Sequence, residues 1–400
     1  MQRVLQNKTF LKLWIGNLAS GFGDVLYDVA VVWYITEKTG SATKAGGVAL
    51  AVMLGKILGG LSVSFSINRI PSKYIMVGSD LIRVLALGYL WYAFHHNPSL
   101  DLMYFYIIGF FIAFFTAWFS PVRNKIIPVI IKDPELLVKA NTFDGSSGAI
   151  IMISSWFLGG IIVALFGIYD TIIVDLFTFV ISTLMVLWAK WEDDIKDIAD
   201  TSFRKTINSY KELKKNKLLT KIVSVETLYL ILCGFFWAAI PIKIKELGGG
   251  ATLFGLQGSF FGLGFLLSSI YFGYKKNINI GKTYKNGISI HWLGNFLASI
   301  SWLPIGWIVG VFIAGLGNTP YAVSRQTIYQ TQTNTENRGN FYAIIEMLSN
   351  AVLFPAWLLG SILTDQWSAT QVMSITIGLQ FIILLYIYSI KELKNINSEK

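Results

Sequence analysis

The chain has 400 residues, of which 54% are hydrophobic and only 14% are charged, and its mean hydropathy is +0.56. A soluble domain carries about 25% charged residues, so this composition excludes an ordinary soluble protein and predicts many membrane-spanning segments. The single cysteine, Cys233, excludes an internal disulfide and a metal site built from cysteines alone.

Twelve apolar segments follow one another along the chain. Each is long enough to cross a bilayer as a helix, which takes about 20 mainly apolar residues. A very short turn, Phe166 to Asp170, separates the fifth segment from the sixth. The sequence therefore predicts an all-α membrane protein with twelve transmembrane helices. The segments lie at residues 11–35, 45–66, 74–94, 102–122, 144–166, 168–190, 219–242, 252–273, 284–302, 304–326, 340–363 and 368–390.

A long polar stretch divides these segments into two sets of six, and the two sets repeat. Gly40–Gly46 opens the second segment as Gly249–Gly255 opens the eighth, and Gly55 and Gly264 keep the same offset. Paired halves of this kind are typical of transporters whose substrate path runs at the interface of the halves. The predicted parts are an N-terminal six-helix half at 1–190, a cytoplasmic linker at 191–218, a C-terminal six-helix half at 219–391 and a cytoplasmic tail at 392–400.

The basic residues predict the orientation in the membrane. The chain carries 33 Lys and Arg residues and a formal net charge of +10, and most of these residues fall on alternate loops, on the side of both termini. Cytoplasmic loops are enriched in Lys and Arg. The sequence therefore predicts cytoplasmic termini in a plasma membrane, and the positive charge needs no nucleic-acid partner to explain it.

Charged residues within the first two predicted helices are the first candidates for a functional site. Asp24 and Asp28 lie four residues apart on one helix face, and Asp24 and Lys56 lie at matching depth near mid-membrane, where they could form an ion pair. Intramembrane charges are rare and usually functional. One interpretation is that Asp24, with Asp28, binds a coupling proton or a cationic substrate. The other is a static Asp24–Lys56 pair with Asp28 hydrated near the outer mouth.

Further charged residues lie towards the inner ends of the predicted helices. Arg83 follows Asp80 by three residues, which predicts a local pair that stabilises a gate. Arg123 and Arg325 end the fourth and tenth helices, either as anchors at the membrane surface or as partners in an inner gate. Asp144, at the start of the fifth helix, is expected to act as a cap or gate residue.

Residues that could line a cavity come mainly from the second half. Glu226 and Glu346 could attract protons or cationic compounds into an inward cavity, or could simply be hydrated there. Trp118 and Trp237 could line an apolar cavity or belong to the aromatic belts at the membrane surfaces. His291 is expected to be a buried, hydrogen-bonded histidine.

Motifs for nucleotide binding or hydrolytic chemistry do not occur. The sequence contains no Gly-x-x-x-x-Gly-Lys-Ser/Thr loop, no His-Glu-x-x-His and no Gly-x-Ser-x-Gly. We therefore expect a protein that is not an enzyme, with no cofactor and no metal, and an energy source other than ATP.

Four stretches of the sequence carry a recognisable pattern: Asn17 with Gly23-Asp24, the loop Thr36–Ala42, the segment Asn68–Arg83 and the segment Ser120–Asn141. They resemble the major facilitator superfamily, most of all the branch of bacterial drug exporters with the macrolide efflux permeases and the enterobactin exporter. The resemblance covers essentially the whole chain. It implies twelve helices in two pseudo-symmetric halves, that is, the major facilitator fold.

The loop after the second helix departs from the superfamily pattern Gly-x-x-x-Asp-Arg-x-Gly-Arg-Lys. Asn68 stands in place of the Asp, while Arg69 and Lys73 remain. The resemblance implies that these residues form a gate motif. An Asn in place of the Asp can hydrogen-bond but supplies no charge. In the fifth helix only Gly159 and Gly160 remain of the antiporter pattern Gly-Pro-x-x-Gly-Gly.

These observations together predict a monomeric bacterial secondary transporter that exports a lipophilic or amphipathic drug-like compound against proton entry. The missing ATP motifs and the carboxylates in the path favour the proton, and the resemblance supplies the direction. One alternative is an exporter of a siderophore, peptide antibiotic or lysolipid. Another is a membrane sensor or partner subunit that keeps the fold without transporting.

Overall fold

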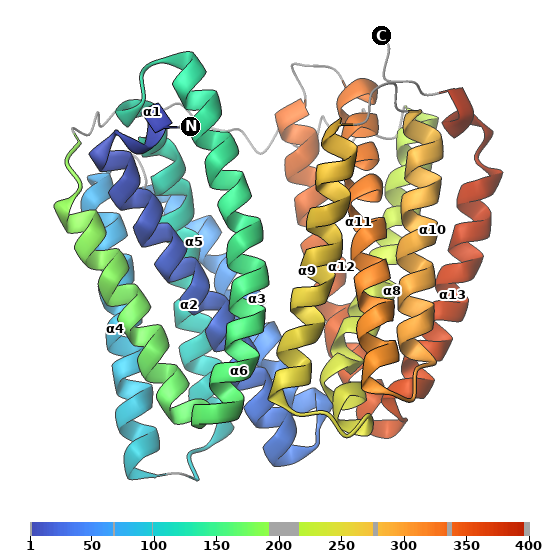
Figure 1. The fold of residues 1–400 in the computed structure, drawn as a ribbon, viewed down its shortest axis with the longest axis horizontal. Coiled ribbons are helices and arrows are strands. Elements are labelled where there is room, and N and C mark those ends of the chain that lie inside the picture. Colours follow the sequence, from blue (N-terminus) through green and yellow to red (C-terminus); the bar gives the residue numbers. More distant parts are fainter. Residues whose placement is uncertain are drawn as a thin grey trace. The chain divides into compact units, whose positions relative to one another are not determined.

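The computed structural model describes residues 2–66, 69–97, 99–191, 216–274, 279–333 and 338–395. Its elements are helices that run side by side within each part of the chain (Figure 1). They are α1 (Gln2–Leu5), α2 (Lys8–Thr39), α3 (Ala42–Ser66), α4 (Ser72–His96), α5 (Leu102–Ile130), α6 (Pro134–Trp188), α8 (Lys217–Glu246), α9 (Ala251–Tyr274), α10 (Ile280–Ser299), α11 (Pro304–Gln332), α12 (Arg338–Gln366), α13 (Ala369–Ser389) and the short 3₁₀ helix η1 (Lys391–Asn395).

Ten segments of the described chain are long and apolar enough to cross a membrane, and two features reconcile this number with the twelve predicted. Residues 150–188 count as one segment of 39 residues, but Gly167 has φ 71° and ψ −177° and breaks α6 there, so the segment makes two crossings. Helix α10 is 20 residues long but carries Lys282, Lys285 and His291, which lower its hydropathy. The predicted all-α membrane fold is confirmed.

The chain divides into two compact units, residues 1–199 with 250–256 and residues 200–249 with 257–400. In the first unit α2 packs along α6, α3 along α5, and α4 against both α5 and α6. In the second unit α10 packs along α11, and α8 packs against α12 and α13. Each unit thus has its own bundle of packed helices.

The repeated glycines Gly55 and Gly264 have the same role in the two units. A methyl group on Gly55 of α3 would lie 2.3 Å from the carbonyl oxygen of Phe110 in α5. One on Gly264 of α9 would lie 2.3 Å from the carbonyl oxygen of Phe312 in α11. Small residues let membrane helices approach until their backbones touch, so the repeat marks equivalent helix contacts.

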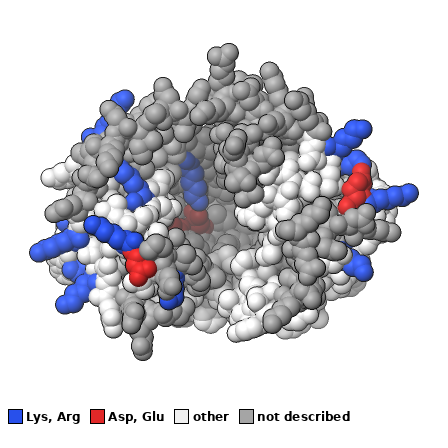
Figure 2. All heavy atoms as spheres, turned by 90° about the horizontal axis from the view of Figure 1, so that it is seen from above, with Lys and Arg blue, Asp and Glu red and all other residues white. Residues whose placement is uncertain are grey.

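Lysines bind the free carbonyl groups at the end of α6. Lys12 Nζ donates to the carbonyl oxygen of Trp188 at 2.8 Å, and Lys73 Nζ donates to those of Leu187 at 2.8 Å and Ala189 at 3.1 Å. Basic side chains are favourable at a helix C-terminus, where carbonyl groups lack partners. Figure 2 shows exposed lysine and arginine side chains at the end that is uppermost in Figure 1.

Candidate functional site

A buried charge cluster lies inside the helix bundle of the first unit. Arg83 on α4 is 1% exposed and forms an ion pair with Asp80, one turn earlier on the same helix and 0% exposed. The Arg83 guanidinium also lies 3.8 Å from Asp24 on α2. A buried charge needs both a partner and hydrogen bonds, and this cluster supplies them for Arg83 and Asp80.

Hydroxyl groups on α5 and α6 complete the cluster. Arg83 Nη1 donates to Thr116 Oγ1 at 3.1 Å, and Thr116 Oγ1 lies 3.0 Å from Asp24 Oδ1. Ser182 donates to the free oxygen of Asp80 at 2.7 Å. The cluster therefore joins α2, α4, α5 and α6 through one arginine.

The aromatic ring of Phe179 lies on the other side of the guanidinium, with its centroid 4.3 Å from Arg83 Cζ. A ring face attracts a cation, and the effect strengthens where water is excluded. The ring thus stabilises the buried charge and shields it from solvent.

Asp24 also faces a small cavity that Asp28 and Lys56 line with it. This cavity has a volume of about 40 Å³, and the side chain of Asp24 is 25% exposed. Within the described residues, no carboxylate lies within 4.0 Å of Lys56, so the static Asp24–Lys56 pair of the second interpretation is not seen, and Asp24 lies beside Arg83 instead. Asp24 is therefore the member of the cluster that solvent can reach.

Asp175 on α6 is a buried acid that the sequence reading missed. It is 0% exposed, its Oδ1 accepts a hydrogen bond from Thr178 at 3.3 Å, and its Oδ2 has no partner in the described structure. The carboxyl group packs on the backbone of Gly23, where a methyl group would lie 2.2 Å from Asp175 Oδ1. Gly23 thus makes room for an acid directly beside Asp24.

The remaining predicted gate residues of the first unit lie apart from this cluster. Arg123 on α5 forms an ion pair with Asp144 on α6, as the gate interpretation expects. Lys73 binds the carbonyl groups at the end of α6, and Arg69 is exposed. Asn68 lies outside the described residues. Trp118 donates from its indole nitrogen to Ser62 at 2.7 Å and packs in an apolar cluster near the end of the bundle.

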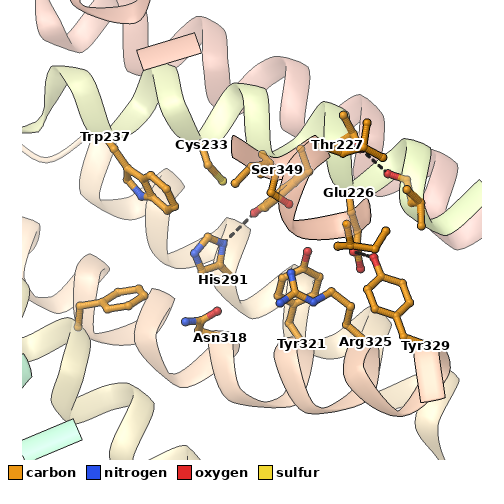
Figure 3. Close-up of a pocket in the computed structure, with 16 residues that line it drawn as sticks. Glu226, Thr227, Cys233, Trp237, His291, Asn318, Tyr321, Arg325, Tyr329 and Ser349 are labelled. Carbon is orange, nitrogen blue, oxygen red and sulfur yellow. Dashed lines mark hydrogen bonds between the residues drawn. The ribbon is translucent and has the colours of Figure 1, made fainter. Parts of the chain in front are cut away.

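A larger pocket lies inside the second unit (Figure 3). Its volume is about 310 Å³, and α8, α9, α10, α11 and α12 contribute its walls. Trp237 and Phe261 line it, and the Trp237 ring lies 6.3 Å from that of Trp357. Trp237 is thus a cavity residue as well as part of an aromatic pair.

Glu226 and Arg325 are the charged side chains described in this pocket. Glu226 is 8% exposed, and its two oxygens accept hydrogen bonds from Tyr284, at 3.1 Å, and from Tyr329. It is therefore buried and bound by side chains, unlike the hydrated alternative given for it. Arg325 Cζ lies 5.4 Å from the centre of the Tyr321 ring. Glu346 lies on α12, and its side chain is outside the described part of the structure.

His291 is buried in the wall of the pocket, as expected. Its Nδ1 lies 2.8 Å from the hydroxyl of Tyr229 and 3.4 Å from the amide nitrogen of Asn295. These contacts fix the orientation of the ring. His291 and Tyr229 thus form a hydrogen-bonded pair that lines the pocket.

Comparison with known families decides the identity of the fold. A profile of the Major Facilitator Superfamily matches residues 13–350. The chain belongs to the major facilitator superfamily. Macrolide efflux protein A of Streptococcus pyogenes is 23% identical over 367 residues, which cover 89% of this chain and 89% of that protein. The MFS-type transporter YfmI of Bacillus subtilis, described as uncharacterized, is 31% identical over 185 residues, or 46% of this chain and 45% of that protein.

Solved structures of major facilitator transporters share the fold. The nucleoside transporter NupG matches with a TM-score of 0.70 and 13% identity, covering 96% of this chain and 98% of that one. An inward-facing bacterial homologue of the iron transporter ferroportin matches with a TM-score of 0.69 and 14% identity, covering 95% and 98%. The protein is thus a multi-pass membrane transporter of a superfamily whose members are in general not enzymes.

Proposed function

We propose that this transporter moves a lipophilic or amphipathic compound out of a bacterial cell in exchange for protons. The position of Asp24 carries the proposal. Asp24 contacts the Arg83 cluster and is also 25% exposed to a cavity, whereas Asp80 is fully buried. A proton that arrives from solvent can therefore reach the Arg83 network through Asp24.

The geometry supports a simple way to couple proton binding to movement. With Asp24 ionised, the Arg83 guanidinium is attracted to carboxylates on both α2 and α4. A proton on Asp24 removes one of these attractions, so Arg83 then holds only Asp80, on its own helix. The link between α2 and α4 weakens, and the equilibrium between inward-open and outward-open states shifts.

The proposed direction of transport and the proposed class of substrate rest on the similarity to Macrolide efflux protein A. Macrolide efflux protein A spans nearly the whole chain, which supports export of a drug-like compound. We also propose the arrangement predicted from the sequence: two six-helix halves at 1–190 and 219–391, a cytoplasmic linker and tail, both termini in the cytoplasm, and a monomer in the bacterial plasma membrane.

The test uses purified protein in liposomes loaded with a radiolabelled macrolide. An imposed pH gradient is expected to drive macrolide movement by the wild-type protein. In Asp24→Asn the gradient should no longer accelerate transport, because the amide does not change its protonation state near neutral pH, while movement down the macrolide gradient should persist. Asp170→Asn is the matched control, since Asp170 is an exposed carboxylate near the turn at Gly167.

Two outcomes would count against the proposal. If Asp24→Asn responds to the pH gradient as the wild type does, the coupling residue is wrong. If the wild type moves no macrolide, a panel with siderophores, peptide antibiotics and lysolipids tests the alternative substrates. A complete lack of transport across that panel would favour a sensor or partner subunit.

A further inference from the structure

Arg325 lines the pocket of the second unit and has no ion pair in the part of the chain that the structure describes. Within the described residues, no carboxylate lies within 4.0 Å of the Arg325 guanidinium, although Glu226 lines the same pocket and attracts it from a greater distance. A guanidinium has five N–H donors in a rigid planar fork. Its described side-chain contacts are with Tyr321, whose ring centre lies 5.4 Å away and whose hydroxyl shares a hydrogen bond with it, and it interacts electrostatically with Glu226. Among the described residues, no further side-chain hydrogen bond of Arg325 is seen, which leaves donors that a ligand could use.

Glu226, by contrast, is already occupied. Its two oxygens accept hydrogen bonds from Tyr284 and Tyr329, which come from α10 and α11. A cationic ligand would have to displace these tyrosines from a carboxylate that is 8% exposed. The pocket is therefore better suited to bind a group that accepts hydrogen bonds from Arg325 than to bind an amine through Glu226.

The rest of the pocket fits the body of an amphipathic molecule. Its volume of about 310 Å³ lies at the lower end of the range of small-molecule sites. Trp237 and Phe261 provide flat apolar walls, and the side chains of Asn318 and Ser349 also line the pocket. Figure 3 shows Arg325, Tyr321 and Asn318 along α11, across the pocket from Glu226 and Trp237 on α8.

We propose that this pocket binds the carboxylate, or another anionic oxygen-rich group, of an amphipathic ligand, with Arg325 as the residue that contacts it. Arginine binds such groups through two parallel hydrogen bonds, which are stronger than neutral ones. The proposal deepens the transport function and rests on it, because it names the class of substrate that this unit selects. Binding can nevertheless be measured without transport.

The test compares three probes with one apolar body and different polar groups: 2-naphthoate, 2-naphthamide and 2-naphthylmethylamine. Each is titrated by calorimetry into the full-length protein in detergent, with no pH gradient. Wild type is expected to bind naphthoate at least about tenfold more tightly than the other two, since a hydrogen bond to a charged group contributes about 1.5–3 kcal/mol.

Variants then locate the site. Arg325→Gln is expected to weaken naphthoate binding about tenfold to a hundredfold and to leave naphthamide binding nearly unchanged. Arg325→Lys should keep part of the preference, because the charge remains but the planar fork is lost. Lys282→Gln, with the same change of charge at an exposed position on α10, is the control and should bind as the wild type does. If a melting scan shows that Arg325→Gln is unstable, Asn318→Ala offers a milder test. We expect Asn318→Ala to weaken naphthoate binding several-fold.

Three results would overturn the proposal. They are tighter binding of the amine than of naphthoate, a loss of naphthoate binding in Lys282→Gln as large as in Arg325→Gln, and the absence of saturable naphthoate binding by the wild type. Proton-driven transport with none of this selectivity would refute the proposed pocket and leave the transport function intact. Selective naphthoate binding without gradient-driven transport would support the proposed pocket and refute the proposed transport function.

Discussion

Replacing Arg83 by methionine is expected to lower the free energy of unfolding by about 3–5 kcal/mol and to abolish transport. Asp80 is 0% exposed, and without Arg83 its described partner would be the hydroxyl of Ser182 alone. A buried carboxylate without its cation is among the most unfavourable arrangements in a protein interior. Asp24 would lose the same partner. Denaturant unfolding in detergent and transport in liposomes measure the two effects.

A second substitution separates the charge from the packing. In Arg83→Met with Asp80→Asn, the buried carboxylate is gone, so we expect the double variant to be more stable than Arg83→Met alone while still failing to transport. Arg69→Met is the control, because Arg69 is exposed and its removal should leave stability nearly unchanged. If Arg83→Met unfolds like the wild type, the cluster does not hold the bundle together.

Replacing Gly23 by alanine is expected to lower stability by about 1–3 kcal/mol and to impair transport. The added methyl group would lie 2.1 Å from Thr178 Oγ1 and 2.2 Å from Asp175 Oδ1, far inside contact distance. The clash would push α6 away from α2 beside Asp24 and so distort the Arg83 cluster. The melting temperature in detergent and proton-driven transport are the measurements.

Gly88→Ala is the matched control for this change, because the nearest atom to its methyl group would be a side-chain carbon of Leu176 at 3.7 Å, an ordinary contact. Combining Gly23→Ala with Asp175→Ala removes one of the two clashing atoms. We expect this double variant to be less destabilised than the sum of the single changes. Additive effects would show that the contact between Gly23 and Asp175 is not the cause.

Much of the fold follows from hydropathy and from glycine. Apolar segments of the right length predict the helices, and the short turn at 166–168 falls where Gly167 breaks α6. The repeat of Gly55 and Gly264 indicates matching contacts in two halves, and backbone atoms meet at both positions. The predicted segment at 284–302 corresponds to α10, whose lysines and histidine lower its hydropathy and are tolerated because most of the helix packs against neighbours.

The site is harder to predict, because depth along a helix does not reveal which way a side chain points. Asp24 and Lys56 lie at similar depth, but the rotation of the helices places Arg83 beside Asp24 instead. Asp175 lies within an apolar run and has no motif around it. The tyrosines on Glu226 come from helices distant in the sequence, so the environment of Glu226 depends on tertiary packing.

The break in α6 at Gly167 has a mechanical consequence. One residue with positive φ joins two membrane crossings, so the connection has almost no slack. Neither arm can shift along its own axis without shifting the other arm in the same direction. An axial movement of one arm is therefore transmitted to the other. An axial movement that Asp24 and Arg83 trigger through Asp175 and Ser182, which lie on the second arm, would displace the first arm as well.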